Sequence, residues 1–283
     1  RSDKEDLMRL DKSYAAFENN GATLSEEDKE KFRTLQTQLS LLTIQFSQNN
    51  LKETNEYNLH LTKKEQLSGL PESQIEQALQ TAKDKGLEGW VITHKAPSDG
   101  PFITFNDNRD LRKKLYLAYN TLCTHDNAYN NFKVVSDLVN TRRQIAQLLG
   151  YPDYASYVLK RRMAGSAENV NKLLNQLVEN YLPKAKEEVA EIEAFAQKLT
   201  GDANFKLQPW DFSYYSQKLQ KERYDFDSET LRPYFELSKV IDGVFGLATK
   251  LYGIRFKLNK DIPVYSPDVD AYEVFYEDGS FLS

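Results

Sequence analysis

A long run of apolar residues at helical spacing most constrains how this chain can fold. Ser25 suits the N-cap of a helix, and Asp28 stands three positions later to complete the cap. The apolar positions that follow alternate between spacings of three and four, and they are Phe32, Leu35, Leu39, Leu42 and Phe46. A stripe of this kind usually packs against a core, and binding to a partner is the alternative. The sequence therefore predicts a long amphipathic helix from about residue 25.

Further helices are predicted along most of the chain, because apolar periodicity repeatedly follows a capping residue and stops at glycine. Ser166 is expected to cap the longest of them, which bends at Pro183. The expected helices are 75–85, 106–122, 132–149, one from Tyr154, 166–199, one opened by Pro209, and 233–252. The chain is therefore expected to be mainly α-helical.

Short strands are predicted at two places. Residues 55–61 and 87–93 are expected to pair in a small sheet. Near the end, 254–258 and the alternating run 272–276 precede an Asp278-Gly279 turn and a returning strand 280–283. A strand that returns for only four residues is what a cut inside a domain would leave. We therefore expect residues 1–283 to be one incomplete helical domain, with helices and short strands in 1–105, helices in 106–253 and the start of a small sheet in 254–283.

Composition limits the classes of partner. The chain has 42 acidic and 37 basic residues, a net charge of -5, which disfavours binding to nucleic acid. Its one cysteine, Cys123, cannot form an internal disulfide, and no apolar run approaches the roughly 20 residues needed to span a bilayer. The first residues have no signal-peptide character and no initiating Met, so an upstream segment is expected to have been removed. Both cytoplasm and periplasm remain open as compartments.

Histidine spacing argues against a metal site in this chain. A helical zinc site needs two imidazoles four residues apart, and none of His60, His94 and His125 has such a partner. Glu56 and His60 are four apart, but in the strand predicted for them they would be separated by about 13 Å. Cys123 and His125 are interpreted as a packed thiol and a surface imidazole. We therefore predict no catalytic and no metal-binding residue within 1–283, and the substrate-binding residues stay unassigned.

Other chemistry-bearing patterns are weak. The chain has no Gly-x-Ser-x-Gly nucleophile motif and no glycine-rich phosphate loop. The paired carboxylates Glu187 and Glu188, and Asp227 with Glu229, are expected on solvated surfaces. The basic cluster 160–162 is expected to be solvated too, with a peptide carboxylate as the alternative ligand. In the aromatic run 210–215, packing in a core is favoured over lining a cleft.

Several segments, taken in order, resemble the thimet oligopeptidase family, and within it most closely the bacterial peptidyl-dipeptidases. The resembling stretches are 86–90 (GLEGW), 104–109 (TFNDNR), 148–151 (LLGY) with Tyr154 and Ala155, 162–164 (RMA) leading to Val170, 210–211 (WD) with Tyr214 and Tyr215, 231–235 (LRPYF), 251–254 (LYGI) with Phe256, and 264–269 (VYSPDV) followed by 272–275 (YEVF). Each motif is short, and it is their order and spacing that make the resemblance specific. One departure is Ser266, where relatives often carry histidine.

The resemblance implies long helices in two lobes around a deep channel, with a small sheet beside a single zinc. The family binds zinc through His-Glu-x-x-His and a later glutamate, and these positions lie beyond the one that matches Ser283. The implied parent is a zinc peptidase that cuts short, unstructured peptides, with this chain as part of the channel wall beside a missing C-terminal portion. The chain itself is then expected to hold no zinc and to cleave nothing. A naturally short, non-catalytic helical binding module is the alternative.

Overall fold

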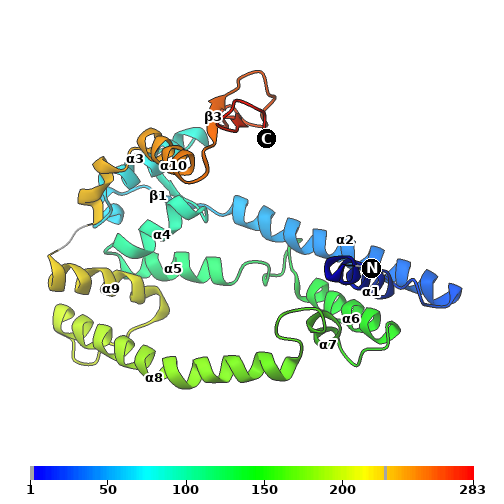
Figure 1. Ribbon diagram of the computed structural model, residues 1–283. Helices are drawn as coiled ribbons and strands as arrows, with labels where there is room; N and C mark the ends of the chain where they lie inside the picture. The colour runs from blue at the N-terminus through cyan, green and yellow to red at the C-terminus, as the bar shows by residue number, and fades with distance from the viewer. Residues whose placement is uncertain (1–2, 226–227) are drawn as a thin grey trace. The chain divides into compact units, whose positions relative to one another are not determined.

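The computed structural model describes residues 3–225 and 228–283 (Figure 1). The chain is mainly α-helical with two small two-stranded sheets, as predicted. It divides into two compact units, Arg1–Leu219 and Gln220–Ser283. Among the helices of the described residues, none is long and apolar enough to cross a membrane.

The first unit begins with two helices, α1 (Lys4–Asn19) and α2 (Glu26–Glu56). The predicted cap of α2 is present, because the Ser25 hydroxyl oxygen accepts a hydrogen bond from the Asp28 backbone N–H at 3.2 Å. Along the predicted stripe Phe32 is buried, the next three residues are half-buried and Phe46 is exposed. Helix α2 packs against α6 (Phe132–Leu148), and Figure 1 shows the two helices side by side.

The predicted pairing of two short strands is confirmed. Strand β1 (Leu59–Leu61) pairs antiparallel with β2 (Trp90–Ile92). The start predicted for the first strand is wrong, because residues 55 and 56 still belong to α2 and only Tyr57 turns to extended backbone. Gly89 makes the pairing possible, since its φ is +86° and a Cβ there would lie 2.3 Å from the Leu61 carbonyl oxygen.

A buried cluster surrounds this strand pair and joins it to the neighbouring elements: the 3₁₀ turn η1 (Lys64–Leu67) and helices α3 (Glu72–Asp84) and α4 (Ala96–Phe105). Helix α4 was not predicted from the sequence, and it contains two prolines, Pro97 and Pro101. Pro97 lies in the first turn, where a backbone N–H has no helical partner, so only Pro101 removes a hydrogen bond. The apolar Phe102 anchors the helix in the core.

The remaining helices of the first unit begin at capping side chains. Helix α5 (Arg109–Asn120) is capped by Asn108, α7 (Tyr154–Leu159) by Asp153 and α8 (Ala167–Thr200) by the predicted Ser166. Helix α8 continues through Pro183, and α9 (Pro209–Tyr224) opens at the expected proline. The C-terminal end of α8 packs with α9 and the loop between them in a second buried cluster, which comprises Ile192, Phe195, Ala196, Phe205, Tyr214 and Tyr215.

The second unit contains the 3₁₀ turn η2 (Ser228–Tyr234), helix α10 (Leu237–Tyr252) and strands β3 (Arg255–Leu258) and β4 (Tyr272–Phe275). The predicted helix start at 233 is wrong, because η2 extends to Tyr234 and α10 begins only at Leu237. The strands pair antiparallel, and Phe256 of β3 stacks on Phe245 of α10 with ring centroids 4.1 Å apart. The predicted turn at Gly279 is confirmed, although the returning segment forms one bridge, Phe275 to Phe281, rather than a four-residue strand.

Candidate functional site

A fully buried carboxylate at the start of α9 organises the polar interior of the first unit. Asp211 is the third residue of α9, and its side chain is 0% exposed. Its Oδ2 accepts a hydrogen bond from the Gln208 backbone N–H at 3.1 Å, so the side chain caps the helix that carries it. One amide cannot compensate a buried negative charge, so further donors are required.

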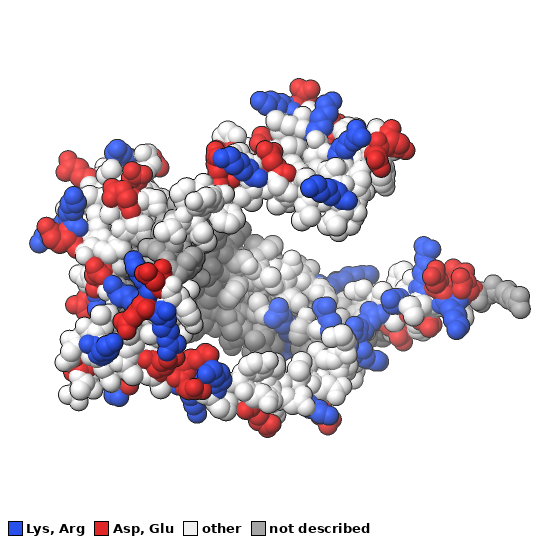
Figure 2. All heavy atoms as spheres, turned by 60° about the vertical axis from the view of Figure 1, so that its left-hand side comes forward, with Lys and Arg blue, Asp and Glu red and all other residues white. Residues whose placement is uncertain are grey.

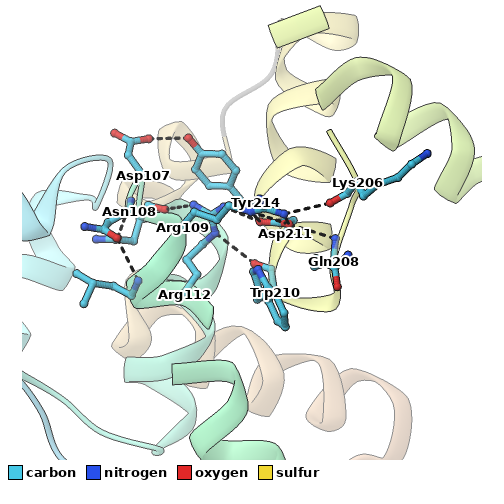
Figure 3. Close-up of polar contacts among 11 residues, drawn as sticks. Asp107, Asn108, Arg109, Arg112, Lys206, Gln208, Trp210, Asp211 and Tyr214 are labelled. Atoms are coloured by element: carbon cyan, nitrogen blue, oxygen red, sulfur yellow. Dashed lines mark hydrogen bonds and ion pairs between the residues drawn. The ribbon is translucent and has the colours of Figure 1, made fainter. Parts of the chain in front are cut away.

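Two arginines of α5 supply these donors (Figure 3). Arg109 and Arg112 lie three positions apart and therefore on one face of the helix. The Arg112 Nη2 donates to Asp211 Oδ1 at 2.9 Å, and the Arg109 Nη2 and Nε donate to Asp211 at 2.6 and 3.0 Å. These three residues are called the Asp211 cluster below.

The other two nitrogens of the Arg112 guanidinium are also engaged. The Arg112 Nη1 donates to the Asn106 carbonyl at 2.8 Å, and its Nε donates to the Trp210 carbonyl at 3.2 Å. The same guanidinium carbon lies 3.9 Å from the Tyr214 ring centroid. These partners explain how an arginine that is 1% exposed can remain charged in the interior.

Tyr214 extends the hydrogen bonding to a second carboxylate. Its hydroxyl donates to Asp107 Oδ1 at 2.8 Å, and the Ser68 hydroxyl donates to Asp107 Oδ2 at 2.7 Å. Burial tends to raise the pKa of Asp107, but these bonds and nearby Lys218 outweigh it and lower the pKa. Burial and the bond to Asp107 raise the pKa of Tyr214, which keeps its hydroxyl protonated as a donor.

The arrangement joins elements that are far apart in the sequence. Asp211 lies 102 and 99 positions from its two arginines, so the cluster fixes α5 against the start of α9. The Asp211 carboxylate is held between two cations and the polar atoms of Arg112 are engaged. The cluster is therefore suited to hold α5 and α9 in position rather than to transfer protons or attack a substrate.

A second carboxylate fastens the end of α2 to the loop between α5 and α6. Glu53 accepts hydrogen bonds from His125 Nδ1 at 2.9 Å, from the Asn127 side-chain amide at 2.9 Å and from the Cys123 backbone N–H. These four residues are called the Glu53 cluster. Burial raises the pKa of Glu53, but the bonds from Asn127, Cys123 and His125 outweigh it and lower the pKa to about 2.

The Glu53 cluster does not fit a metal ion. Burial, followed by the contact with Glu53, raises the pKa of the Cys123 thiol to about 11, whereas the thiolate is the form that binds metals. The carboxylate already serves three donors. Across residues 3–225 and 228–283, no group of three or more His, Cys, Asp or Glu side chains is placed to hold a metal ion. The described residues therefore offer no zinc site.

The three histidines lie in three different settings. His60 is exposed on β1, and its Nε2 lies 2.6 Å from the Glu88 carbonyl oxygen, while Glu56 is in α2 rather than in the strand predicted for it. His94 is buried and stacks on Tyr57 with ring centroids 3.8 Å apart, and burial lowers its pKa to about 4. Cys123 is buried and His125 is exposed, as expected for a packed thiol and a surface imidazole.

The charged pairs singled out from the sequence are on the surface where the structure describes them. Residues 160–162 and Glu187 with Glu188 are exposed, and the Lys160 Nζ lies 5.4 Å from the Tyr151 ring centroid. Asp227 and the side chain of Glu229 lie outside the described residues. Figure 2 shows acidic and basic side chains next to one another over much of the visible face.

A groove between α2 and α6 has a volume of about 740 Å³. It is lined by Glu27, Glu30, Lys31, Thr34, Leu35, Gln144, Gln147 and Leu148. Lys31 and Glu27 already pair with each other at 2.8 Å, so the groove presents no isolated charge from this pair for a ligand.

Neither polar cluster was predicted from the sequence. Core packing was favoured for the aromatic run 210–215, and Tyr214 and Tyr215 are buried while Phe212 is exposed. No role was predicted for Asp211, Arg112 or Glu53. One usable signal was Arg112 itself, because a cation three positions before the buried Leu115 places a charge on the apolar face of α5.

Comparison with protein families matches residues 102–283 of the chain to Peptidase family M3. The match contains the whole Asp211 cluster and α8. The chain belongs to peptidase family M3. Similar curated proteins include oligopeptidase A of Escherichia coli (strain K12), which is 36% identical over 280 residues, and dipeptidyl carboxypeptidase of the same strain, 34% identical over 283 residues. These alignments cover 96% and 99% of the chain.

Each alignment covers 41% of the relative's own length, so this M3 chain spans less than half of either bacterial protein. A more distant relative, saccharolysin of Saccharomyces cerevisiae (strain ATCC 204508 / S288c), is 29% identical over 265 residues. That alignment covers 92% of the chain and 36% of saccharolysin. The relationship thus extends along almost the whole M3 chain.

Proposed function

We propose that this chain is part of a zinc-dependent oligopeptidase that hydrolyses short, unstructured peptides. We further propose that its residues form part of the channel wall rather than the catalytic centre. The observation that carries the proposal is the family match over 102–283 together with the absence of any His-x-x-x-His pair from residues 1–283. The zinc and the general base would then be supplied by residues outside this chain.

The two polar clusters support a structural role for the chain. The Asp211 cluster fixes α5 to α9, and the Glu53 cluster fastens α2 to the loop before α6. Such contacts between distant segments would help a channel wall to keep its shape while peptides enter and leave. They offer no activated nucleophile, because the Cys123 thiol is buried and its pKa is raised to about 11.

The complete gene and its product test this proposal. The reading frame should continue past Ser283 and encode His-Glu-x-x-His, and the full-length protein should carry one zinc and cleave a short peptide until a chelator is added. Residues 1–283 expressed alone should bind no stoichiometric zinc and cleave nothing. A long downstream frame without the motif, or chelator-sensitive cleavage by residues 1–283 alone, contradicts the proposal.

The relatives at 36% and 34% identity have names that describe different modes of cleavage, so the proposal includes both removal of dipeptides and internal cleavage. A pair of peptides separates them. A peptidyl-dipeptidase should cleave a peptide with a free C-terminal carboxylate and reject its C-terminal amide, whereas an oligopeptidase that cuts internally should accept both.

A naturally short binding module is the second candidate. The observation that favours it is the large apolar surface left exposed on α8, which a binding partner could cover. A native stop codon directly after Ser283 would support this candidate against the peptidase.

A further inference from the structure

Within the first unit, no described element covers most of the length of helix α8. Only its C-terminal part contributes to a core, through Ile192, Phe195 and Ala196. Every residue from 171 to 191 is exposed. An isolated helix of this length gains little stability from its backbone alone, because most helical stability in proteins comes from packing an apolar face.

This exposed segment carries an apolar face. Six large apolar residues follow two adjacent rows with a spacing of four, each 42–68% exposed: Leu173, Leu177 and Tyr181 in one row, and Leu174, Val178 and Leu182 in the other. At 100° per residue the two rows cover about half of the helix circumference. These six residues are called the α8 face below.

The opposite side of the same segment is polar. Its residues include Lys172, Asn175, Gln176 and Glu179. Exposure to water is favourable for charged and amide side chains, whereas it is unfavourable for a contiguous aliphatic surface. The division shows which side of α8 is suited to contact another part of a protein and which side is suited to solvent.

We propose that the α8 face is a permanent packing surface, and that its occupant is a helix from the part of the full-length protein that lies outside residues 1–283. The inference rests on the proposed function, because it needs a longer parent. The length of the relatives supports it, because the alignment covers 41% of oligopeptidase A and leaves the remaining 59% of that protein outside. Helix α8 also lies entirely within the family match.

The chemistry of the face favours this occupant over a transient partner. The face is aliphatic with one tyrosine and contains no charged residue, which is typical of obligate interfaces that resemble a divided core. Two adjacent rows with a spacing of four form ridges, and such ridges pack into the grooves of another helix. The occupant is therefore inferred to be an amphipathic helix with its own apolar stripe.

Thiol labelling of the full-length protein tests the inference. The variant Leu177→Cys places a thiol in the face, and Asn175→Cys is the matched control, two positions away and about 200° around the helix. Native Cys123 contributes little background, because it is buried and its thiol pKa is raised. The thiol in L177C should react with a maleimide at least tenfold more slowly than the thiol in N175C. Equal rates would overturn the proposal, and so would a gene that ends at Ser283.

Photo-crosslinking from the L177C thiol then identifies the occupant. The crosslinked peptide should come from beyond residue 283, in a species with the mass of one chain. A crosslink to a second copy, or to a residue within 1–283, overturns the proposal. If the variant does not fold, hydrogen exchange of the unmodified full-length protein gives the same decision: residues 171–191 should exchange as slowly as 192–200, and fast exchange contradicts the proposal. None of these measurements depends on zinc or hydrolysis, so a failure of the proposed activity is distinguished from a failure of this surface.

Discussion

The Asp211 cluster and the Glu53 cluster both hold distant segments together around one carboxylate, but the hydrogen-bond donors differ. Each uses one carboxylate to fasten segments that are far apart in the sequence, 99–102 positions in one case and 70–74 in the other. Asp211 is 0% exposed and its side-chain partners are two guanidinium groups. Glu53 is 13% exposed and its partners are an amide side chain, a backbone N–H and an imidazole.

The difference concerns what remains when the carboxylate is removed. Without Asp211, the cation of Arg112 stays buried and uncompensated, which is among the most destabilising changes in a protein interior. Without the charge of Glu53, its donors face a weaker acceptor, and the exposed His125 can turn to water instead. The loss of stability on removing a carboxylate should therefore depend more on how deeply its partner is buried than on the number of hydrogen bonds.

The largest effect is expected for Asp211→Ala. The variant should lose about 3–5 kcal/mol in free energy of unfolding, because it strands a buried arginine. Urea denaturation of the full-length protein measures the loss. Glu188→Ala removes an exposed carboxylate of α8 and should change stability by less than about 0.5 kcal/mol. Similar losses for the two variants would break the comparison.

Glu53→Gln should have a smaller effect, a loss of about 1–3 kcal/mol, because the amide keeps the shape but accepts hydrogen bonds more weakly and places one N–H₂ against donors. Glu56→Gln, on the next turn of α2, is the matched control. Glu56 is exposed and accepts from the Tyr129 hydroxyl, so the control should lose less. A loss for Glu53→Gln as large as that for Asp211→Ala would show that partner burial does not set the order.

The pH dependence sharpens the same comparison. The pKa of Glu53 is lowered from an ordinary 4.5 to about 2 in the folded protein, so its ionised form stabilises the fold above about pH 4.5. That contribution should decline as the pH falls from 4.5 and be lost as it passes through about 2. The stability difference between the wild type and Glu53→Gln should therefore shrink across this window in urea denaturation. A difference that stays constant from pH 6 to pH 2 would contradict the assigned cause.

The helix cap of α2 gives a smaller effect. Ser25→Ala removes the acceptor for the Asp28 backbone N–H and should cost about 1 kcal/mol. Ser25→Asp retains an acceptor and should restore most of the loss. Thermal denaturation of the two variants provides the measurement, and equal melting temperatures would show that the cap contributes nothing.

The smallest effect is expected at the surface of α2. Lys31 pairs with Glu27 at 2.8 Å and with Asp28 at 3.3 Å, and all three side chains are exposed. Lys31→Ala should cause the smallest loss of stability among these variants at low salt and almost none at 1 M salt, because screening removes most of the attraction. A loss that does not respond to salt would point to packing of the lysine stem instead.

Local signals predicted much of the fold. Caps such as Ser25 and Ser166, and glycines that end helices, act within a few residues, so the sequence displays them directly. Helix α4 was missed because two prolines conceal a helix that is held in place by its buried Phe102. The starts of β1 and α10 were misplaced because neighbouring helical turns compete for the same residues.

The polar clusters could not be predicted from such signals. Arg112 and Asp211 are ordinary charged residues in the sequence, and their meaning depends on the packing of α5 against α9. Glu53 likewise belongs to an exposed-looking helix end until the loop 121–131 folds back on it. The family resemblance was recognised from motifs that include residues 210–211, without any indication that one of them is a buried anchor.

The separation between Arg112 and Asp211 also sets an order of events during synthesis. Arg112 leaves the ribosome 99 residues before its partner, and at about 5–20 residues per second the wait is on the order of 5–20 s. During that interval its guanidinium has to stay hydrated, so α5 cannot settle into its final place. A nascent chain arrested before residue 211 should therefore leave α5 open to protease, whereas one arrested with α9 outside the exit tunnel should protect it.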